Sequence, residues 1–331
     1  MSKDILKLNK CGIYCPAGDF YVDPWKPVDN ALITHAHADH ARWGMKKYLA
    51  HKDSVDIMRL RLGKDINIQG VAYKEKININ GVKVSFHPAG HILGSSQIRI
   101  ETDGQVAVVS GDYKIQPDST CAPFELVKCN TFITESTFAL PIYNWDNEEK
   151  IFQGINTWWQ GNAELGIASV LYGYALGKSQ RVLSGLDNSI GNIYTHGAVE
   201  NITEIYRKRG VKMPPTTLST SVDNKTDFSK SIIIAPSSAH GTPWLRKFGD
   251  ISTAFASGWM QVRGNKRRAN YDKGFVMSDH VDWTGVLDTV KNTGAENIWI
   301  THGYSEILSR YLNENGYNSK VLETLFDDAD I

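Results

Sequence analysis

Short apolar runs separated by polar turns recur along this 331-residue chain and predict a succession of buried strands. The segment 82–86 alternates apolar and polar residues, whereas 106–109 is continuously apolar. Alternation is typical of a strand with one solvated face, and a continuous run is typical of a strand buried on both faces. Further strand-like runs stand at 31–33, 131–133, 275–277 and 297–300. These runs predict a layered sheet whose strands end in polar loops.

The pattern changes between about residue 143 and about residue 262. Helical patterns at 148–160 and 199–209 alternate there with strand runs at 167–172 and 231–235. Such alternation predicts a separate α/β domain with a parallel sheet. The length of the chain allows one large or two ordinary domains, each with a sizeable core.

The amino-acid composition limits which classes of protein the chain can belong to. Lys plus Arg and Asp plus Glu both total 36, so the net charge is zero and any surface for nucleic acid must be local. The first residues form no secretion signal, and no apolar run approaches membrane-spanning length, so we expect a soluble, cytoplasmic protein without a membrane partner. The cysteines do not form paired C-x-x-C motifs, which favours free thiols in a reducing compartment. They are Cys11, Cys15, Cys121 and Cys129.

The densest group of potential metal ligands follows the apolar run 31–33. Four metal-capable side chains stand within six residues there: His35, His37, Asp39 and His40. Residues two apart on an extended backbone point the same way, so His35 and His37 can bind one cation together while Asp39 and His40 face a second. Imidazole nitrogen and carboxylate oxygen favour Zn²⁺, with Mn²⁺ or Fe as alternatives. The spacing after a buried strand disfavours a chance surface cluster.

Other strand ends carry further candidates. His91 lies in a glycine-flanked loop, where the backbone can come close to a ligand, and we assign it as the third ligand of the first metal. Asp112 follows the run 106–109 and can bridge two metals with its two oxygens. Asp23 ends an earlier strand and can accept a hydrogen bond from a metal-binding histidine, with Asp19 as the weaker choice. Each carboxylate could instead be an ordinary turn residue.

Three later strands also end in functional side chains, namely Glu135, His280 and His302. The metal loop resembles the signature of the metallo-β-lactamase superfamily, and the later motifs, in this order, resemble its β-CASP nuclease group. The resemblance implies an αβ/βα sandwich that holds two metals at the edge of its two sheets. It also implies an inserted α/β β-CASP domain, here 143–262, between two parts of the catalytic core, here 1–142 and 263–331.

Four further segments resemble the bacterial ligase-associated DNA exonucleases, namely 23–25, 88–95, 176–181 and 256–260. Relatives of that family include the Artemis-like repair nucleases and the endonucleases that process mRNA 3′ ends. The resemblance implies phosphodiester hydrolysis, with DNA favoured over RNA, and a DNA exonuclease that acts in repair with a DNA ligase/helicase system. A histidine at the last motif, here His302, is usual in RNA-acting members, so a ribonuclease of the RNA-processing type is the alternative.

Two metals can acidify a shared water and hold phosphate oxygens. We assign His35, His37 and His91 to one metal. Asp39, His40 and His302 bind the other. Asp112 bridges them, and Asp39 and Asp112 also count as catalytic residues. His280 is the expected proton donor to the leaving oxygen, oriented by Glu135 or, alternatively, by Asp279.

Basic residues in two places are candidates for substrate binding: Lys178, Arg181, Arg263, Lys266, Arg267 and Arg268. The run 263–268 could equally be a solvated charged loop. The segment 173–179 resembles a P-loop but is one residue short, which disfavours nucleotide hydrolysis.

Two other functions share part of the pattern. Thioester or lactam hydrolysis needs the first motif but neither the inserted domain nor a Glu135–His280 pair. A metal-free scaffold that binds nucleic acid is disfavoured because every ligand position is filled.

Overall fold

The computed structural model describes residues 5–223, 225–262 and 270–325. The chain forms two compact units. Unit 1 contains the chain up to Asn144 and again from His280, and unit 2 is Trp145–Asp279. Unit 2 therefore interrupts unit 1 in the sequence. Both units mix helices with sheets, so the fold belongs to the α/β class, as the sequence predicts.

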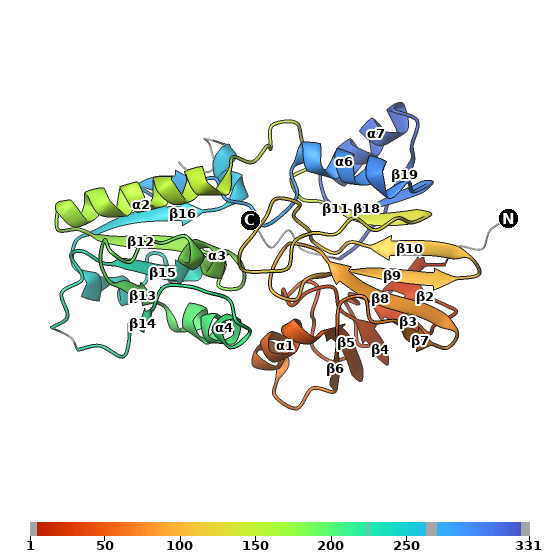
Figure 1. Cartoon of the computed structure of the whole chain (residues 1–331), viewed down its shortest axis with the longest axis horizontal. Helices are drawn as coiled ribbons and strands as arrows, with labels where there is room; N and C mark the ends of the chain where they lie inside the picture. The colour runs from red at the N-terminus through yellow and green to blue at the C-terminus, as the bar shows by residue number, and fades with distance from the viewer. Residues whose placement is uncertain (1–4, 224, 263–269, 326–331) are drawn as a thin grey trace. The chain divides into compact units, whose positions relative to one another are not determined.

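The first sheet of unit 1 has six strands in the order β1-β2-β3-β4-β5-β6 (Figure 1). The strands are β1 (Lys7–Asn9), β2 (Gly12–Cys15), β3 (Phe20–Val22), β4 (Asn30–Leu32), β5 (Lys47–His51) and β6 (Ile68–Val71). β1 to β3 pair antiparallel, and β3 to β6 pair parallel. Between β5 and β6 lie the short helix η1 (Lys52–Ser54) and α1 (Val55–Leu62), whose Ile57 and Met58 are buried.

The second sheet of unit 1 has seven strands in the order β19-β18-β11-β10-β9-β8-β7. They are β7 (Ile77–Ile79), β8 (Val82–Pro88), β9 (Ser96–Thr102), β10 (Gln105–Val109), β11 (Thr131–Ser136), β18 (Asn297–Gly303) and β19 (Asn318–Val321). β7 to β10 pair antiparallel, and β10, β11, β18 and β19 pair parallel. The helices α6 (Trp283–Thr293) and α7 (Ser305–Glu314) belong to the same unit.

Two apolar cores lie on opposite faces of the seven-stranded sheet. One core joins this sheet to the six-stranded sheet, and the other joins it to α6 and α7. Within β10, Ala107 and Val109 belong to the first core and Val108 to the second. This explains why the run 106–109 shows no alternation, because both faces of the strand are covered.

Unit 2 is built on one parallel sheet in the order β14-β13-β15-β12-β16-β17 (Figure 1). The strands are β12 (Ala168–Gly173), β13 (Ile193–Thr195), β14 (Thr217–Leu218), β15 (Ile232–Pro236), β16 (Ile251–Ala256) and β17 (Lys273–Phe275). A core on one face includes α2 (Glu148–Glu164), α3 (Lys178–Ser184) and α4 (Gly197–Lys208). The other face packs against η2 (Ser237–Ala239) and η3 (Pro243–Phe248), and η4 (Gly258–Gln261) follows β16.

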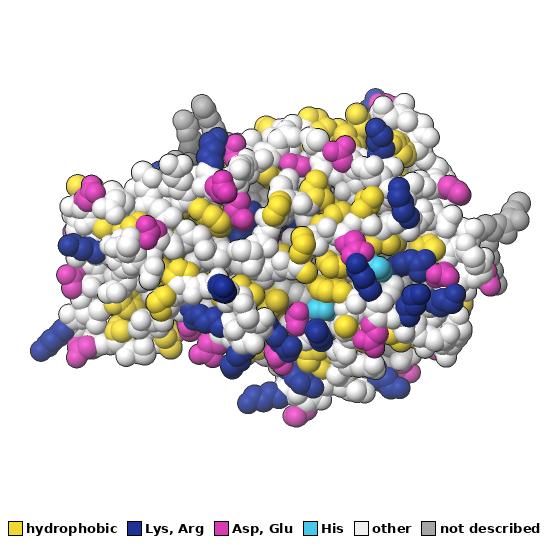
Figure 2. Space-filling view, viewed as in Figure 1, with side chains coloured by type: hydrophobic (Ala, Val, Ile, Leu, Met, Phe, Trp, Pro, Cys, Tyr) yellow, Lys and Arg dark blue, Asp and Glu magenta, His cyan; other side chains and the backbone are white. Residues whose placement is uncertain are grey.

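Charged side chains of both signs are interspersed over the face shown in Figure 2. This fits a chain with as many basic as acidic residues. Among the described residues, no helix combines the length and the apolar character needed to cross a membrane.

Candidate metal centre

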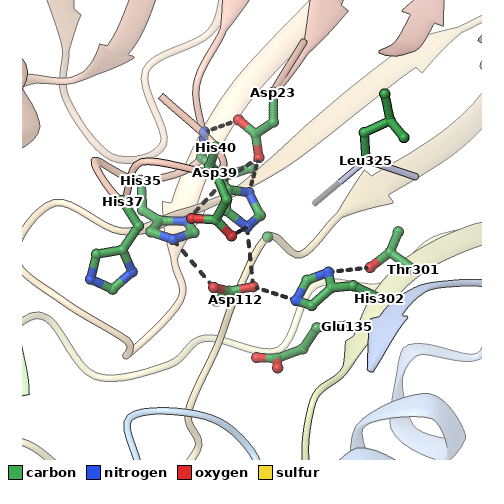
Figure 3. Close-up of polar contacts among 12 residues, drawn as sticks. Asp23, His35, His37, Asp39, His40, Asp112, Glu135, Thr301, His302 and Leu325 are labelled. Carbon is green, nitrogen blue, oxygen red and sulfur yellow. Dashed lines mark hydrogen bonds and ion pairs between the residues drawn. The ribbon is translucent and has the colours of Figure 1, made fainter. Parts of the chain in front are cut away.

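The polar loops at several strand ends of unit 1 meet in one place (Figure 3). One loop follows β4, one follows β8 and one follows β10, while β11 and β18 add side chains near their own ends. Four overlapping groups result, each with potential ligand atoms within 4.8 Å of one another. Three of them contain all the side chains that the sequence predicts as metal ligands: His35, His37, Asp39, His40, His91, Asp112 and His302.

Asp112 lies at the middle of this arrangement, and its two oxygens face different imidazoles (Figure 3). Asp112 Oδ2 is 3.3 Å from His35 Nε2 and 3.8 Å from His91 Nε2. Asp112 Oδ1 is 3.4 Å from His40 Nε2 and 3.3 Å from His302 Nε2. A carboxylate that divides its oxygens between two sets of nitrogen atoms has the geometry required to bridge two cations.

The remaining candidates complete the two sets. His37 Nδ1 lies 3.0 Å from His91 Nε2, so His37 joins the group on the Oδ2 side. Asp39 Oδ2 lies 3.2 Å from His40 Nε2, and Asp39 forms a group with His35 and His40. Asp39 therefore lies beside imidazoles of both sets.

The donor atoms fit a pair of divalent cations. Among the described residues, the buried atoms of the cluster without a hydrogen-bond partner include His35 Nε2, Asp39 Oδ1 and Asp112 Oδ1. A buried polar atom without a hydrogen bond is costly, and a metal ion would satisfy atoms of this type. Imidazole nitrogens with carboxylate oxygens form a donor set that suits Zn²⁺.

Charge interactions match these roles at Asp112 and His91, whereas the carboxylates of Asp39 and Asp112 outweigh burial and raise the pKa of His40 well above its usual value. Burial would raise the pKa of Asp112, but the neighbouring His40 and His35 hold that pKa well below its usual value. Burial lowers the pKa of His91 well below its usual value, and the surrounding histidines lower it further. An ionised carboxylate and a neutral imidazole are the forms that bind metal.

Asp23 lies outside the ligand groups and supports the cluster through hydrogen bonds. Its Oδ1 accepts a hydrogen bond from Thr34 N at 2.8 Å, and its Oδ2 lies 2.7 Å from His40 Nδ1. Because Asp23 occupies Nδ1, the other ring nitrogen of His40 is directed toward Asp112. Asp19, the weaker sequence candidate, instead accepts a hydrogen bond from Tyr14 Oη at 2.9 Å.

Glu135 and His280 form a buried pair beside Asp112. Glu135 Oε2 lies 2.8 Å from His280 Nδ1, and Glu135 Oε1 accepts a hydrogen bond from Tyr113 N at 2.8 Å. Asp112, Glu135 and His280 make up a group of close potential ligand atoms. The carboxylate at His280 Nδ1 is thus Glu135, whereas Asp279 pairs with Lys178 and Arg181 in unit 2.

Two of the candidate substrate-binding residues are placed differently from the sequence expectation. Lys178 and Arg181 are 1% and 4% exposed, and both pair with Asp279. Side chains buried in this way do not present a charged surface to a phosphate. The other four lie outside the described residues: Arg263, Lys266, Arg267 and Arg268.

Two residues that are not among the predicted site residues support the loops of the metal centre. Arg61 of α1 donates a hydrogen bond to the carbonyl of Ala36 inside the metal loop. Ser95 Oγ accepts hydrogen bonds from His91 N at 3.1 Å and from Ile92 N at 3.2 Å, which fixes the loop that carries His91. The Gly94-Ser95 turn marks the second contact in the sequence, but nothing local marks Arg61.

None of the known protein-family models matches this chain. A probable DNA ligase of Opitutus terrae is 27% identical over 308 residues, which are 92% of this chain and 30% of that protein. An RNase J-like protein of Methanocaldococcus jannaschii is 26% identical over 229 residues, 60% of this chain and 54% of that protein. Cleavage and polyadenylation specificity factor subunit 3 of Dictyostelium discoideum is 24% identical over 196 residues, 48% of this chain and 25% of that protein.

The chain thus spans only part of the length of these curated relatives. A crystal structure of a protein of unknown function from Enterococcus faecalis V583 has a similar fold, with a TM-score of 0.59 at 11% identity. The similarity covers 90% of this chain and 80% of that one. The curated relatives confirm the resemblance stated from the sequence, because the chain is similar to β-CASP nucleases of the metallo-β-lactamase superfamily.

Proposed function

We propose that this protein is a two-metal nuclease that hydrolyses phosphodiester bonds in nucleic acid. The observation that carries the proposal is the position of Asp112, whose Oδ2 faces His35 and whose Oδ1 faces His302. One carboxylate placed between two imidazole sets suits the two-metal chemistry of phosphodiester cleavage. Relatives named as RNases and as a DNA ligase support a nucleic-acid substrate.

The proposed cofactors are two divalent ions, with Zn²⁺ preferred and Mn²⁺ or Fe as alternatives. One ion would be held by His35, His37 and His91. The other would be held by Asp39, His40 and His302, with Asp112 bridging. When bound, such ions lower the pKa of a shared water and neutralise charge on the phosphate.

The protein's own residues supply orientation and a proton. Asp23 keeps His40 Nε2 directed into the cluster. Glu135 accepts a hydrogen bond from His280 Nδ1, which leaves Nε2 to carry the proton for catalysis. The attacking water releases one proton to solvent as its oxygen bonds to phosphorus. The ester P–O bond breaks, the leaving oxygen takes the proton from His280 Nε2, and solvent then reprotonates His280.

We further propose that the sheets of unit 1 form the αβ/βα sandwich of this superfamily. The apolar core shared by the six- and seven-stranded sheets supports this assignment. Unit 2, with its parallel sheet, would be the inserted β-CASP domain.

DNA is the proposed substrate, and exonuclease action in DNA repair the proposed role. The relative that matches 92% of this chain is named a probable DNA ligase and is much longer, which supports a link to a cytoplasmic DNA ligase/helicase repair system. RNA is the second candidate, because the relatives named as RNases and the His302 side chain favour it.

End-labelled single- and double-stranded DNA and RNA, each incubated with Zn²⁺ or Mn²⁺, test the proposal. We expect stepwise shortening of DNA from one end, and no cleavage by Asp112→Ala. Faster cleavage of RNA would select the second candidate. Binding of all four substrates without cleavage at any metal concentration would instead indicate the scaffold function.

A further inference from the structure

A cluster of buried charges in unit 2 lies outside the metal centre. Lys178 Nζ is 2.9 Å from Asp279 Oδ2, and Arg181 Nη1 is 3.0 Å from Asp279 Oδ1. Arg181 Nε also lies 2.5 Å from Glu148 Oε1. Lys178, Arg181 and Asp279 are each at most 4% exposed. We call these four residues the Asp279 cluster.

Two cations and two carboxylates balance the charge of the Asp279 cluster, and both oxygens of Asp279 are engaged. Arg181 additionally donates a hydrogen bond to the carbonyl of Ser278. The cluster therefore fixes the backbone of residue 278 as well as the side chain of residue 279. Burying several charges away from water costs free energy. Buried ion pairs of this kind can serve to fix one conformation and not to add stability.

The segment that supplies the two cations is itself tightly held. Gln180 Oε1 accepts a hydrogen bond from Gly177 N at 2.8 Å, and Gln180 Nε2 donates one to Thr203 Oγ1 at 3.1 Å. Ser179 Oγ donates to the carbonyl of Tyr174 at 2.7 Å. The whole motif 178–181 is directed inward, which matches a rigid support and not a surface for substrate.

The residue after Asp279 is His280, the proposed proton donor. Asp279 is fixed by contacts within unit 2, and His280 is fixed by Glu135 within unit 1. Consecutive Cα atoms are about 3.8 Å apart, so a shift of Asp279 is passed directly to the backbone of His280. Misplacement of a catalytic group by about 1 Å can reduce the rate by roughly a hundredfold.

We propose that Lys178 and Arg181 are positioning residues, which act through Asp279 to hold His280 in the orientation needed for proton donation. This inference rests on the proposed function for its effect on catalysis. On this proposal, the motif 176–181 anchors the chain at the residue just before the proton donor.

The test compares Asp279→Asn, which keeps the shape of the side chain but removes its charge, with Glu200→Gln as a matched control. Glu200 also pairs with an arginine in unit 2, at 3.1 Å from Arg207 Nη1, and its other hydrogen bonds among the described residues come from Thr195 and Thr216. Both variants are analysed with full metal content and compared with the wild-type protein.

The first measurement does not depend on activity. The Nδ1 proton of His280, held by Glu135 in a buried site, should give a slowly exchanging NMR signal. We expect Asp279→Asn to speed its exchange by roughly tenfold or more, and Glu200→Gln to leave it unchanged. An unchanged signal in Asp279→Asn would overturn the inference, even if the protein proved to cleave no nucleic acid.

The second measurement compares turnover of nucleic acid with turnover of a nitrophenyl phosphodiester, whose leaving group needs no proton. Asp279→Asn should lower turnover of nucleic acid by roughly tenfold or more and leave the ester within about twofold. Equal losses on both substrates would show a merely structural cluster. Should Asp279→Asn fail to fold, Arg181→Lys replaces it in both measurements, because it keeps the charge but loses the planar contacts to residues 278 and 279.

Discussion

Asp112 Oδ1 lies 3.3 Å from His302 Nε2, although Asp112 follows β10 in the first stretch of unit 1 and His302 belongs to β18 in the second. Unit 2 is inserted between the two strands in the sequence. The pairing β10-β11-β18 in one parallel sheet brings the two strand ends together. The second half of the proposed metal centre is therefore complete only when the last part of the chain has joined the sheet.

Purified protein should contain about two divalent ions per chain, and a chelator should abolish cleavage until metal is restored. Asp112→Ala should remove both the bridge and the activity, because each Asp112 oxygen faces a different set of imidazoles. Metal analysis by mass spectrometry, with thermal unfolding as the control for folding, checks this. Full activity in a metal-free preparation would contradict the two-metal proposal.

His302→Ala should weaken one metal site far more than the other. His302 lies near Asp112 Oδ1, whereas His35 and His91 lie near Oδ2. Stepwise metal titration should therefore show one tight and one weakened binding event in this variant. The reverse pattern is expected for His91→Ala, which serves as the matched comparison. Simultaneous loss of both ions in both variants would argue against two separable sites.

Asp23→Asn should lower metal affinity by roughly tenfold to a hundredfold, because Asp23 orients His40 without touching the metals. Asp19→Asn is a close control. Both aspartates have positive backbone φ angles, 43° for Asp23 and 52° for Asp19, and asparagine tolerates that conformation. Calorimetric metal titration of the two variants separates the effect on His40 from any effect on the backbone. Equal metal affinities of the two variants would show that Asp23 does not support the metal centre.

The metal loop and the other strand-end side chains could be predicted from sequence because their signals are local. A strand-like run that is followed by His35 to His40, or by Asp112, can be recognised from a few consecutive residues. The burial of Lys178 and Arg181 could not be predicted in this way. Two cations three residues apart at a helix start look solvent-exposed, and Asp279, which pairs with both of them, stands 98 residues from Arg181. The role of Arg61 has no local sequence signal either, since only the tertiary fold brings it to the loop.

His280 is the proposed proton donor to the leaving oxygen. His280→Ala should lower turnover of nucleic acid by roughly a hundredfold or more, the usual scale for loss of general acid catalysis. Substrate affinity and metal content should change little, because His280 is not among the proposed ligands. Steady-state kinetics and metal analysis on the same preparations measure both quantities.

An ester with a nitrophenolate leaving group separates the two roles that His280 could have. Its leaving group needs no proton, so His280→Ala should hydrolyse it nearly as fast as the wild-type protein. Glu135→Gln should show the same preference in weaker form, because its amide can no longer hold a charged imidazole at Nδ1 as firmly as the carboxylate does. Loss of an ion from His280→Ala, or equal damage on both substrates, would instead place His280 among the metal ligands, since it lies in one group with Asp112 and Glu135.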